Sequence, residues 1–224
     1  PIVLSQPYSI RSIAHYGDNL VVSLFDPSQS RGAGIVQVYD LTTGALRFSL
    51  TQPGDSTTSF GHTVKIEDNV IAVASGGGIS DDGSVYLYNA ADGALLRTIE
   101  NPAVDEVQSF ASDIDVSSGR VIVSARRQFQ GTALVFNVSD GSLLTEFLVP
   151  GQGWDSAQTY PAWYTPSVEL AGDKAYVGAG LINVPFEGSE TTYSVAAGKV
   201  FEFDVPTSQL NRTWTNPDSG TMIF

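Results

Sequence analysis

The sequence predicts an all-β protein built from repeats. A phrase of strand, acidic or Asn turn, glycine and strand recurs as VYDLTTGALRFSL, LYNAADGALLRTI and VFNVSDGSLLTEF. Its turn glycines, Gly44, Gly93 and Gly141, lie 49 and 48 residues apart. A fourth copy, VFEFDVPTSQLNRTW, begins at Val200 and has Ser208 near the glycine position. A period of about fifty residues indicates a repeat architecture, in which each unit packs against its neighbours.

Each repeat divides into four alternating apolar runs bounded by turn residues, as expected of an antiparallel meander. The first repeat predicts strands at 10–15, 20–24, 35–39 and 45–50, and the second predicts them at 61–66, 70–75, 84–88 and 94–99. The third predicts strands at 111–116, 120–125, 133–136 and 142–148, and the fourth at 166–170, 175–178, 199–203 and 209–214. A four-stranded antiparallel unit of about fifty residues is typical of a propeller blade.

We therefore predict a β-propeller of four-stranded antiparallel blades, with about four blades in this chain. The blades span approximately residues 8–50, 58–100, 108–149 and 163–215. Residues 1–224 are expected to form a single propeller domain or part of one, and we expect the natural polypeptide to be longer. Such blades bury both of their faces only by stacking radially against one another.

The amino-acid composition argues against some classes of binding partner and favours some cellular locations. The formal net charge is −13, from 11 basic and 24 acidic residues. Nucleic acid is therefore not an expected partner, because phosphate contacts need clustered Lys and Arg. No apolar run approaches the roughly 20 residues of a membrane helix, so no direct membrane insertion is expected. The chain has no Cys, one Met, few Lys and many Ser, Thr and Gly. These features favour an extracellular, cell-surface or virion protein.

The segment SFGHTVKIEDNVIAVASGGG, which starts at Ser59, resembles the FG-GAP repeats. Those repeats form the blades of integrin α-subunit propellers and of many bacterial extracellular proteins. Phe60-Gly61 matches the Phe-Gly pair that opens the innermost strand in that family, and Phe110-Ala111 keeps the aromatic residue. The strand–turn–strand phrase is also similar to quinoprotein-like propeller repeats. Both resemblances imply a propeller.

The resemblance to FG-GAP blades also implies, in many of them, an Asp-rich calcium loop between the first and second strands. The corresponding connections here are 16–19, 67–69, 117–119 and 171–174. Each is predicted to be a tight hairpin, and none has the several spaced oxygen ligands that a calcium loop needs. The sequence therefore departs from the family at this point, and no metal site is expected.

The order of the strands divides the connections between the two ends of the blades. The first–second and third–fourth turns share one end, which we call the turn end. The other end, which we call the loop end, carries the connections 26–34, 51–59, 75–83, 101–109, 126–131, 150–163 and 180–198. Elaborated loops on one face of a rigid scaffold commonly carry binding. We therefore expect a partner-binding surface at the loop end, chiefly in the fourth blade.

The loop end of the fourth blade concentrates aromatic residues. The entry loop contains Trp154, Tyr160, Trp163 and Tyr164, and the insertion contains Phe186 and Tyr193. Exposed aromatic side chains suit protein interfaces and stacking on sugars. The alternative is that these side chains pack on one another beneath the two long loops.

Two further features are candidates for binding. The basic pair Arg126-Arg127 is predicted on a loop beside Phe129, where it would bind a partner carboxylate or remain solvated. Asp113 and Asp115 alternate with apolar residues on an innermost strand, so they could approach the central channel and bind a ligand.

The sequence has no nucleophile elbow, zinc-protease motif or phosphate-binding loop, and it points to no catalytic residue and no cofactor. We expect a non-enzymatic scaffold for attachment or assembly, whose partner is another protein subunit or a surface ligand. One alternative is an enzyme or a cofactor-binding, quinoprotein-like propeller with a site in the central channel. Another is a lectin-like propeller that binds glycans. Polar groups that span several blades and have shifted pKa values would favour the channel site.

Overall fold

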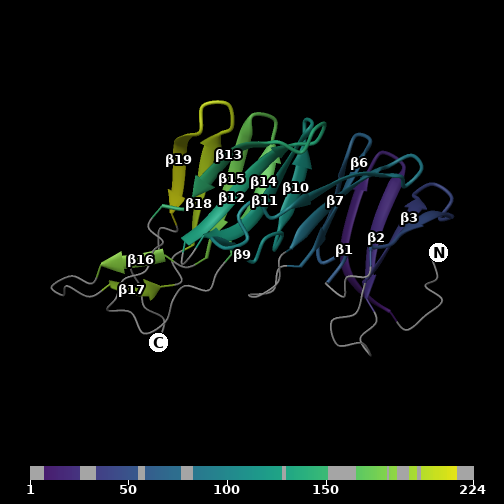
Figure 1. Cartoon of the computed structure of the whole chain (residues 1–224), viewed down its shortest axis with the longest axis horizontal. Coiled ribbons are helices and arrows are strands. Elements are labelled where there is room, and N and C mark those ends of the chain that lie inside the picture. Colours follow the sequence, from purple (N-terminus) through teal and green to yellow (C-terminus); the bar gives the residue numbers. More distant parts are fainter. Residues whose placement is uncertain are drawn as a thin grey trace.

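The computed structural model describes residues 8–25, 34–54, 59–76, 83–127, 130–150, 165–180, 182–185, 192–195 and 198–215. Four antiparallel sheets stand side by side in chain order, from the N-terminal sheet to the C-terminal one (Figure 1). The described residues include no helix of a length and hydropathy that would allow it to cross a membrane. The fold is all-β, as predicted.

Each sheet is one blade. Blade 1 consists of β1 (Ser9–Tyr16), β2 (Asn19–Phe25), β3 (Ile35–Asp40) and β4 (Leu46–Leu50). Blade 2 consists of β5 (Val64–Glu67), β6 (Val70–Ser75), β7 (Ser84–Asn89) and β8 (Leu95–Glu100). Blade 3 consists of β9 (Val107–Gln108), β10 (Ile114–Ser117), β11 (Arg120–Arg127), β12 (Gln130–Asn137) and β13 (Leu143–Leu148). Blade 4 consists of β14 (Ser167–Ala171), β15 (Lys174–Ala179), β18 (Lys199–Asp204) and β19 (Gln209–Thr215). A separate two-stranded sheet pairs β16 (Ile182–Pro185) with β17 (Thr192–Val195).

Every predicted strand has a counterpart in the structure, but the innermost strands β5 and β10 begin three residues later than predicted. The reason is a left-handed backbone at Gly61 (φ 78°) and Ala111 (φ 64°), which interrupts the extended conformation. The N–H of Gly61 still donates to Ala74 O at 2.9 Å, and that of Ala111 donates to Ser124 O at 3.1 Å. The Phe-Gly motif therefore marks a bulge at the start of the innermost strand.

Three short strands lie in segments that were predicted as loops. The two-residue strand β9 pairs with the last residues of β11, and the hairpin of β16 and β17 lies within the 180–198 insertion. Strands this short contain too few residues for an alternating pattern to reveal them.

The recurring turn phrase forms the same structure in three blades. The last residue of the third strand, Asp40, Asn89 or Asn137, accepts a nearby backbone N–H through its side-chain oxygen at 2.8–2.9 Å. Its backbone carbonyl accepts the N–H of the turn glycine at 2.8 Å. These glycines have φ of 73–75°, a conformation that favours glycine. In blade 4 Ser208 occupies the equivalent position with φ 57°.

Replacing Ser208 with glycine is expected to raise the free energy of unfolding by about 1 kcal/mol, because a left-handed conformation costs a non-glycine residue about 1–2 kcal/mol. The hydroxyl that is lost lies 2.6 Å from Thr145 Oγ1, in a hydrogen bond on the exposed surface. Urea-induced unfolding at neutral pH measures the change. Gly119→Ser is the reverse control, since Gly119 has φ 74° and open space around an added Cβ. A Ser208→Gly variant that is less stable than wild type would contradict this account.

Two of these turns also depress the pKa of a carboxyl group. Hydrogen bonds from Arg47 and then Thr43 lower the pKa of Asp40 to about 2. Hydrogen bonds from Lys174 and then Thr207 lower the pKa of Asp204 to about 2. Because each pKa in the folded state lies below the ordinary value of 3.8, the ionised groups stabilise the fold above about pH 4. This contribution is lost as the pH falls through about 2.

The substitution Arg47→Met is expected to return the pKa of Asp40 part of the way toward 3.8, because the largest depressing interaction is removed. The pKa of Asp204, which is set by Lys174 and Thr207, is expected to stay at about 2. Titration of the side-chain carboxyl carbons by NMR measures both groups in one sample. An unchanged midpoint for Asp40 would show that Arg47 does not set its pKa.

The core consists of layers, each buried between two successive blades. We call the side of a blade that meets the following blade its forward face, and the opposite side its rear face. The forward-face residues are Val21, Val36, Val38 and Leu50 in blade 1, Ala72, Val85, Leu87 and Ile99 in blade 2, and Ile122, Ala133, Val135 and Phe147 in blade 3. Burial of such side chains supplies most of the favourable free energy of stacking.

The aromatic residue of the Phe-Gly motif lies at the centre of a layer. Phe60 and Phe110 are the largest fully buried side chains among the described residues. Phe60 packs against Tyr86, with ring centroids 5.8 Å apart, and Phe110 packs edge-on against Phe136 at 6.1 Å. Phe60 also shares a core cluster with Val36 of blade 1, and Phe110 shares one with Val85 of blade 2, so the motif contributes to the packing between successive blades.

Candidate functional site

The two ends of the blades differ as predicted. At the turn end, along the upper edge of Figure 1, two-residue turns at 17–18, 68–69, 118–119 and 172–173 join the first and second strands. At the loop end the connections include 26–34, 51–63, 76–83, 149–166 and 180–198. The long connections of the chain therefore start and finish at one end of a rigid stack of sheets.

Blade 3 departs from this pattern, and the predicted loop at 126–131 is wrong. Arg126 and Arg127 extend strand β11, and β12 begins at Gln130, so only residues 128–129 join the two strands. The added strand β9 explains the extension, because Arg126 pairs with Gln108 and Arg127 with Val107 in its ladder. The basic pair therefore belongs to a sheet and not to a loop tip.

Arg127 makes its ion pairs within this blade. Its guanidinium donates to both carboxylate oxygens of Glu146, at 2.8 and 3.0 Å, and also to Glu106. The hydrogen bonds with Glu146 raise the pKa of Arg127. Arg126 is buried and donates to Gln108, and burial lowers its pKa. Both guanidinium groups thus bind side chains of blade 3, and binding of a partner carboxylate by either of them stays a prediction.

The aromatic candidates fall where the structure gives no side chain. Trp154, Tyr160, Trp163, Tyr164 and Phe186 lie outside the described residues, and so does the side chain of Tyr193. The backbone of Tyr193 is part of β17, opposite Val184. Their role in binding therefore also stays a prediction.

Asp113 and Asp115, which the sequence suggested as ligands at the channel, bind the next blade. Asp113 Oδ2 accepts the backbone N–H of Val168 at 3.0 Å, and Asp115 Oδ2 accepts that of Leu170 at 2.8 Å. Ser12 does the same between blades 1 and 2, where its hydroxyl accepts the N–H of Val64 at 3.1 Å. Side chains of one innermost strand thus hold the backbone of the next.

Lys65 and Glu169 join Asp115 in a cluster that spans three blades, and the sequence reasoning did not identify them. Lys65 Nζ lies 3.3 Å from Asp115 Oδ1 and 3.3 Å from Glu169 Oε2. All three lie two residues before the end of their innermost strand, so an alignment of the repeats would have grouped them. The cluster thus links polar side chains of blades 2, 3 and 4.

The pKa values in the cluster reflect burial and charge. Burial acts to lower the pKa of Lys65, but the carboxylates of Asp115 and Glu169 outweigh burial, so the pKa is raised. Burial raises the pKa of Asp115, against the opposing hydrogen bond from Leu170 and the charge of Lys65. Nearby, burial and then the charge of Arg11 lower the pKa of His62. Among the described residues, no group of three or more His, Asp or Glu is arranged to hold a metal ion.

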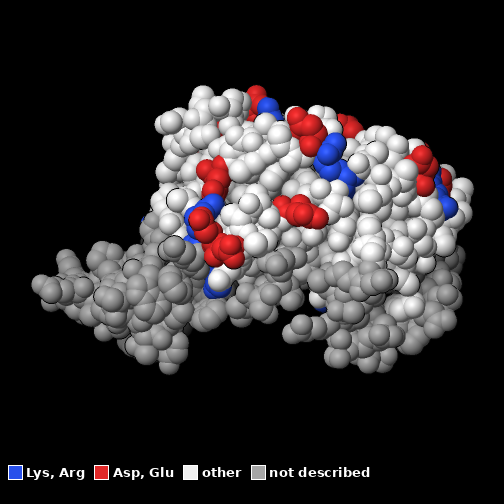
Figure 2. Space-filling view, in the orientation of Figure 1, with Lys and Arg blue, Asp and Glu red and all other residues white. Residues whose placement is uncertain are grey.

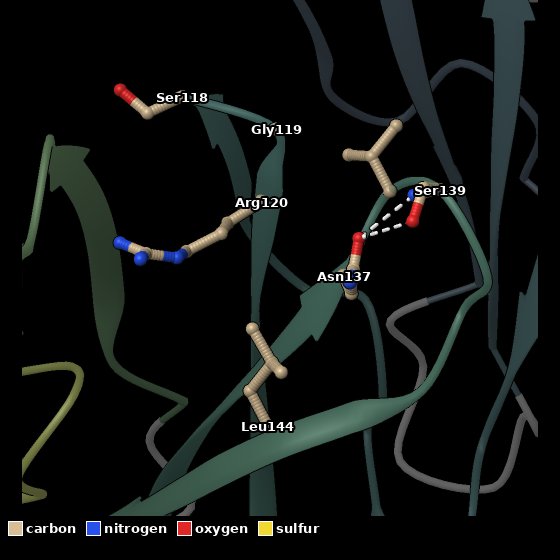
Figure 3. Close-up of a pocket in the computed structure, with 7 residues that line it drawn as sticks. Ser118, Gly119, Arg120, Asn137, Ser139 and Leu144 are labelled. Carbon is tan, nitrogen blue, oxygen red and sulfur yellow. Dashed lines mark hydrogen bonds between the residues drawn. The ribbon is translucent and has the colours of Figure 1, made fainter.

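A shallow pocket lies at the turn end of blade 3 (Figure 3). Its lining includes Ser118, Gly119, Arg120, Asn137, Ser139 and Leu144. The Oδ1 atom of Asn137 accepts the backbone N–H and the hydroxyl of Ser139, each at 2.9 Å. Arg120 extends toward blade 4 and donates to Asp173 Oδ1 at 2.6 Å and to Gly172 O at 3.2 Å. The polar groups of this pocket therefore stabilise turns and the contact with the next blade.

The charged side chains form no broad basic surface in the view of Figure 2, where Lys and Arg lie in small groups beside Asp and Glu. Uncharged surface separates these groups. This distribution agrees with the ion pairs between Arg47 and Asp40, Arg120 and Asp173, and Lys174 and Asp204.

No family model and no curated protein matches the chain. Solved structures match it in fold. The quinohemoprotein alcohol dehydrogenase from Comamonas testosteroni is 15% identical with a TM-score of 0.61, and the match covers 92% of this chain and 35% of that one. The Dos1 propeller is 16% identical with a TM-score of 0.54, and the match covers 93% and 48%. The β-propeller domain of the Trilobed protease from Pyrococcus furiosus is 10% identical with a TM-score of 0.53, and the match covers 96% and 58%. The chain thus spans about a third to three fifths of these structures, and it has a β-propeller fold.

Proposed function

We propose that the chain is a non-enzymatic propeller scaffold for protein–protein attachment or assembly on a cell surface, a secreted structure or a virion. The partner is another protein subunit or a surface ligand, and it binds at the loop end. The aromatic residues Trp154, Tyr160 and Trp163 are the chief contacts in this proposal.

The proposal rests on a contrast between two parts of the blades. The polar groups of the innermost strands bind the neighbouring blade, whereas the loop end carries long connections. On the innermost strands, Ser12, Asp113 and Asp115 bind the backbone of the following blade. These groups stabilise the stack of blades, because their side-chain oxygens accept hydrogen bonds from the backbone of the neighbouring blade. The loop end adds long connections rich in aromatic residues to this stack, and rigid scaffolds commonly bind through such loops.

The test compares capture of surface and secreted proteins of the source by three immobilised forms of the chain. These are the wild type, the loop-end variant Trp154→Ser/Tyr160→Ser/Trp163→Ser, and a turn-end control, Leu41→Ser/Leu144→Ser. Biolayer interferometry measures the bound mass, and circular dichroism checks that each form is folded. We expect binding to fall about tenfold or more in the loop-end variant alone, as for loss of aromatic anchors. Equal capture by all three forms would refute binding at the loop end.

A second candidate function has an observation in its favour. The cluster of Lys65, Asp115 and Glu169 spans three blades and has raised pKa values at Lys65 and Asp115, as a channel site for a substrate or cofactor would. The fold of the quinohemoprotein alcohol dehydrogenase is similar. Calorimetric titration with a soluble quinone cofactor tests this candidate, with Lys65→Met as the variant. Saturable binding that Lys65→Met abolishes in a folded protein would favour the channel over the scaffold.

Two finer assignments also belong to this proposal. The chain is an FG-GAP-like propeller, which the left-handed Gly61 after the buried Phe60 supports. The other assignment is a lectin-like function, in which the aromatic loops bind a glycan. Binding to a glycan array that disappears in Trp154→Ala or Trp163→Ala would identify a sugar as the ligand.

A further inference from the structure

The cluster of Lys65, Asp115 and Glu169 brings a primary amine into contact with two carboxyl groups. Lys65 Nζ lies 3.3 Å from Asp115 Oδ1 and 3.3 Å from Glu169 Oε2. The Cγ atom of Asp115 is one covalent bond beyond Oδ1, so the amine already lies beside a carbon with which it can form an amide. The three side chains come from β5, β10 and β14, and β10 contacts both of the other strands. A bond between Lys65 and Asp115 would therefore join blade 2 to blade 3.

The two carboxyl groups have different surroundings, which suit them to different roles. The side chain of Asp115 is 11% exposed, whereas that of Glu169 is 63% exposed. Burial raises the pKa of Asp115 and so favours its uncharged acid, which an amine attacks more readily than it attacks a carboxylate anion. Asp115 is therefore suited to be the acyl group, and the solvated Glu169 is suited to carry protons.

Strand β14 also supplies a hydrogen-bond donor where negative charge would develop. The backbone N–H of Leu170 donates to Asp115 Oδ2 at 2.8 Å. When an amine attacks Cγ, the Oδ2 atom becomes the oxyanion of the tetrahedral intermediate, and a fixed N–H at this atom stabilises it. Glu169 and Leu170 are neighbours in β14, so one strand holds both the proton carrier and the oxyanion donor in place.

We propose that Lys65 and Asp115 condense to an isopeptide bond, with Glu169 as the proton carrier. One proton of the Lys65 ammonium passes through Glu169 to Asp115 Oδ1, which gives a neutral amine and a carboxylic acid. The amine then forms the Nζ–Cγ bond, and a second proton passes by the same route from Nζ to Oδ1. The Cγ–Oδ1 bond breaks and water leaves. The ammonium and the carboxylate thus become one amide and one water, with no oxidant or reductant.

The reaction needs to occur only once in each molecule. The neighbouring carboxylates raise the pKa of Lys65, so its amine is protonated in the resting cluster and the condensation is expected to be slow. Hydrolysis is opposed because the two groups stay oriented toward each other, and oriented groups reach effective molarities of about 10⁵ M or more. The chain has no Cys, so this bond would provide a covalent link between blades that disulfides cannot supply.

Mass spectrometry of the wild-type chain tests the bond directly. We expect the intact mass to lie below the sequence mass by one water molecule. Trypsin cleaves after Lys and Arg but not after an acylated lysine, so a digest of the denatured chain is expected to contain peptide 48–97 joined to peptide 98–120. The joined peptide is the decisive signal, because an Asp-Gly step such as Asp92-Gly93 can also lose water without joining two peptides.

Four variants test the role of each group. Lys65→Arg keeps the positive charge but replaces the amine with a weakly nucleophilic guanidinium, and it is expected to abolish the joined peptide. Asp115→Asn is expected to form the bond with loss of ammonia in place of water. Glu169→Gln is expected to lower the joined fraction about tenfold or more. Asp113→Asn is the matched control, since Asp113 binds the N–H of Val168 in β14, and it is expected to behave as wild type. Circular dichroism checks that each variant is folded.

The outcomes separate the parts of the proposal. A wild-type chain of full sequence mass that trypsin cleaves completely after Lys65 would overturn it. Peptide 48–97 joined to peptide 128–174 would show that Glu169 is the acyl group, against the assignment of Asp115. An unchanged joined fraction in Glu169→Gln would overturn its role as proton carrier. The bond removes the charges of Lys65 and Asp115, so it excludes an ionic channel site at these residues, whereas partner binding at the loop end is independent of it.

Discussion

Replacing Gly83 with alanine is expected to lower the free energy of unfolding by about 3 kcal/mol. Gly83 directly precedes β7, and a Cβ at this position would overlap the backbone carbonyl oxygen of Phe110 in the next blade. A backbone atom at the centre of a packed layer cannot move aside as the tip of a flexible side chain can. The effect is thus expected to separate blades 2 and 3, and it is measured by chemical unfolding at neutral pH.

Gly178→Ala is the matched control for this substitution. Gly178 also lies in a blade, but its added Cβ would make ordinary contacts at 3.8 Å with Ser167, so we expect a change below about 1 kcal/mol. Gly34 repeats the geometry of Gly83, since its Cβ would overlap the carbonyl oxygen of Phe60. A Gly83→Ala variant as stable as Gly178→Ala would show that the blades can separate without loss of stability.

The substitution Phe110→Ala is expected to lower the free energy of unfolding by about 3–5 kcal/mol. The Phe110 side chain is fully buried and packs edge-on against Phe136, so its removal leaves a cavity between blades 2 and 3. Because Phe110 lies between two blades and not within one sheet, unfolding is expected to lose cooperativity. Calorimetric and spectroscopic melting curves that no longer coincide would reveal this loss.

Leu144→Ala provides the comparison for Phe110→Ala. Leu144 is 47% exposed beside the turn-end pocket, and its truncation is expected to change the stability by less than about 0.5 kcal/mol. If Phe110→Ala lowered the free energy of unfolding no more than Leu144→Ala does, the buried layer between blades 2 and 3 would not be a main source of stability.

Much of this architecture was predictable because the repeat encodes local structure. Asp40, Asn89 and Asn137 each set a turn by bonding to a neighbouring backbone N–H, and this depends only on residues nearby in the chain. The alternation of apolar residues likewise locates the strands, since both faces of an inner blade are buried. Even the degraded fourth copy was aligned correctly, with Ser208 at the left-handed position.

The candidate site was predicted less well, because its chemistry lies between blades. Lys65, Asp115 and Glu169 are about fifty or more residues apart in the sequence, and only the stacking of three innermost strands brings their charged groups within 3.3 Å. The loop assigned to Arg126-Arg127 failed for a similar reason. Strand β9 lies in the connection that precedes β10 and pairs with the end of β11. No local sequence pattern predicts this pairing.

By itself, then, the sequence determined the all-β class, the four blades and their turns, since each follows from contacts close in the chain or from a regular period. The tertiary structure alone decided which polar side chains join the blades and which apolar side chains of the described residues are buried. Asp113 and Asp115 could have lined a channel, yet they hold the backbone of β14. Ile13 and Val200 have the apolar character of buried residues, yet they lie exposed. The physical reason is that burial depends on which blade stands next to a residue, and this is settled only when the blades stack.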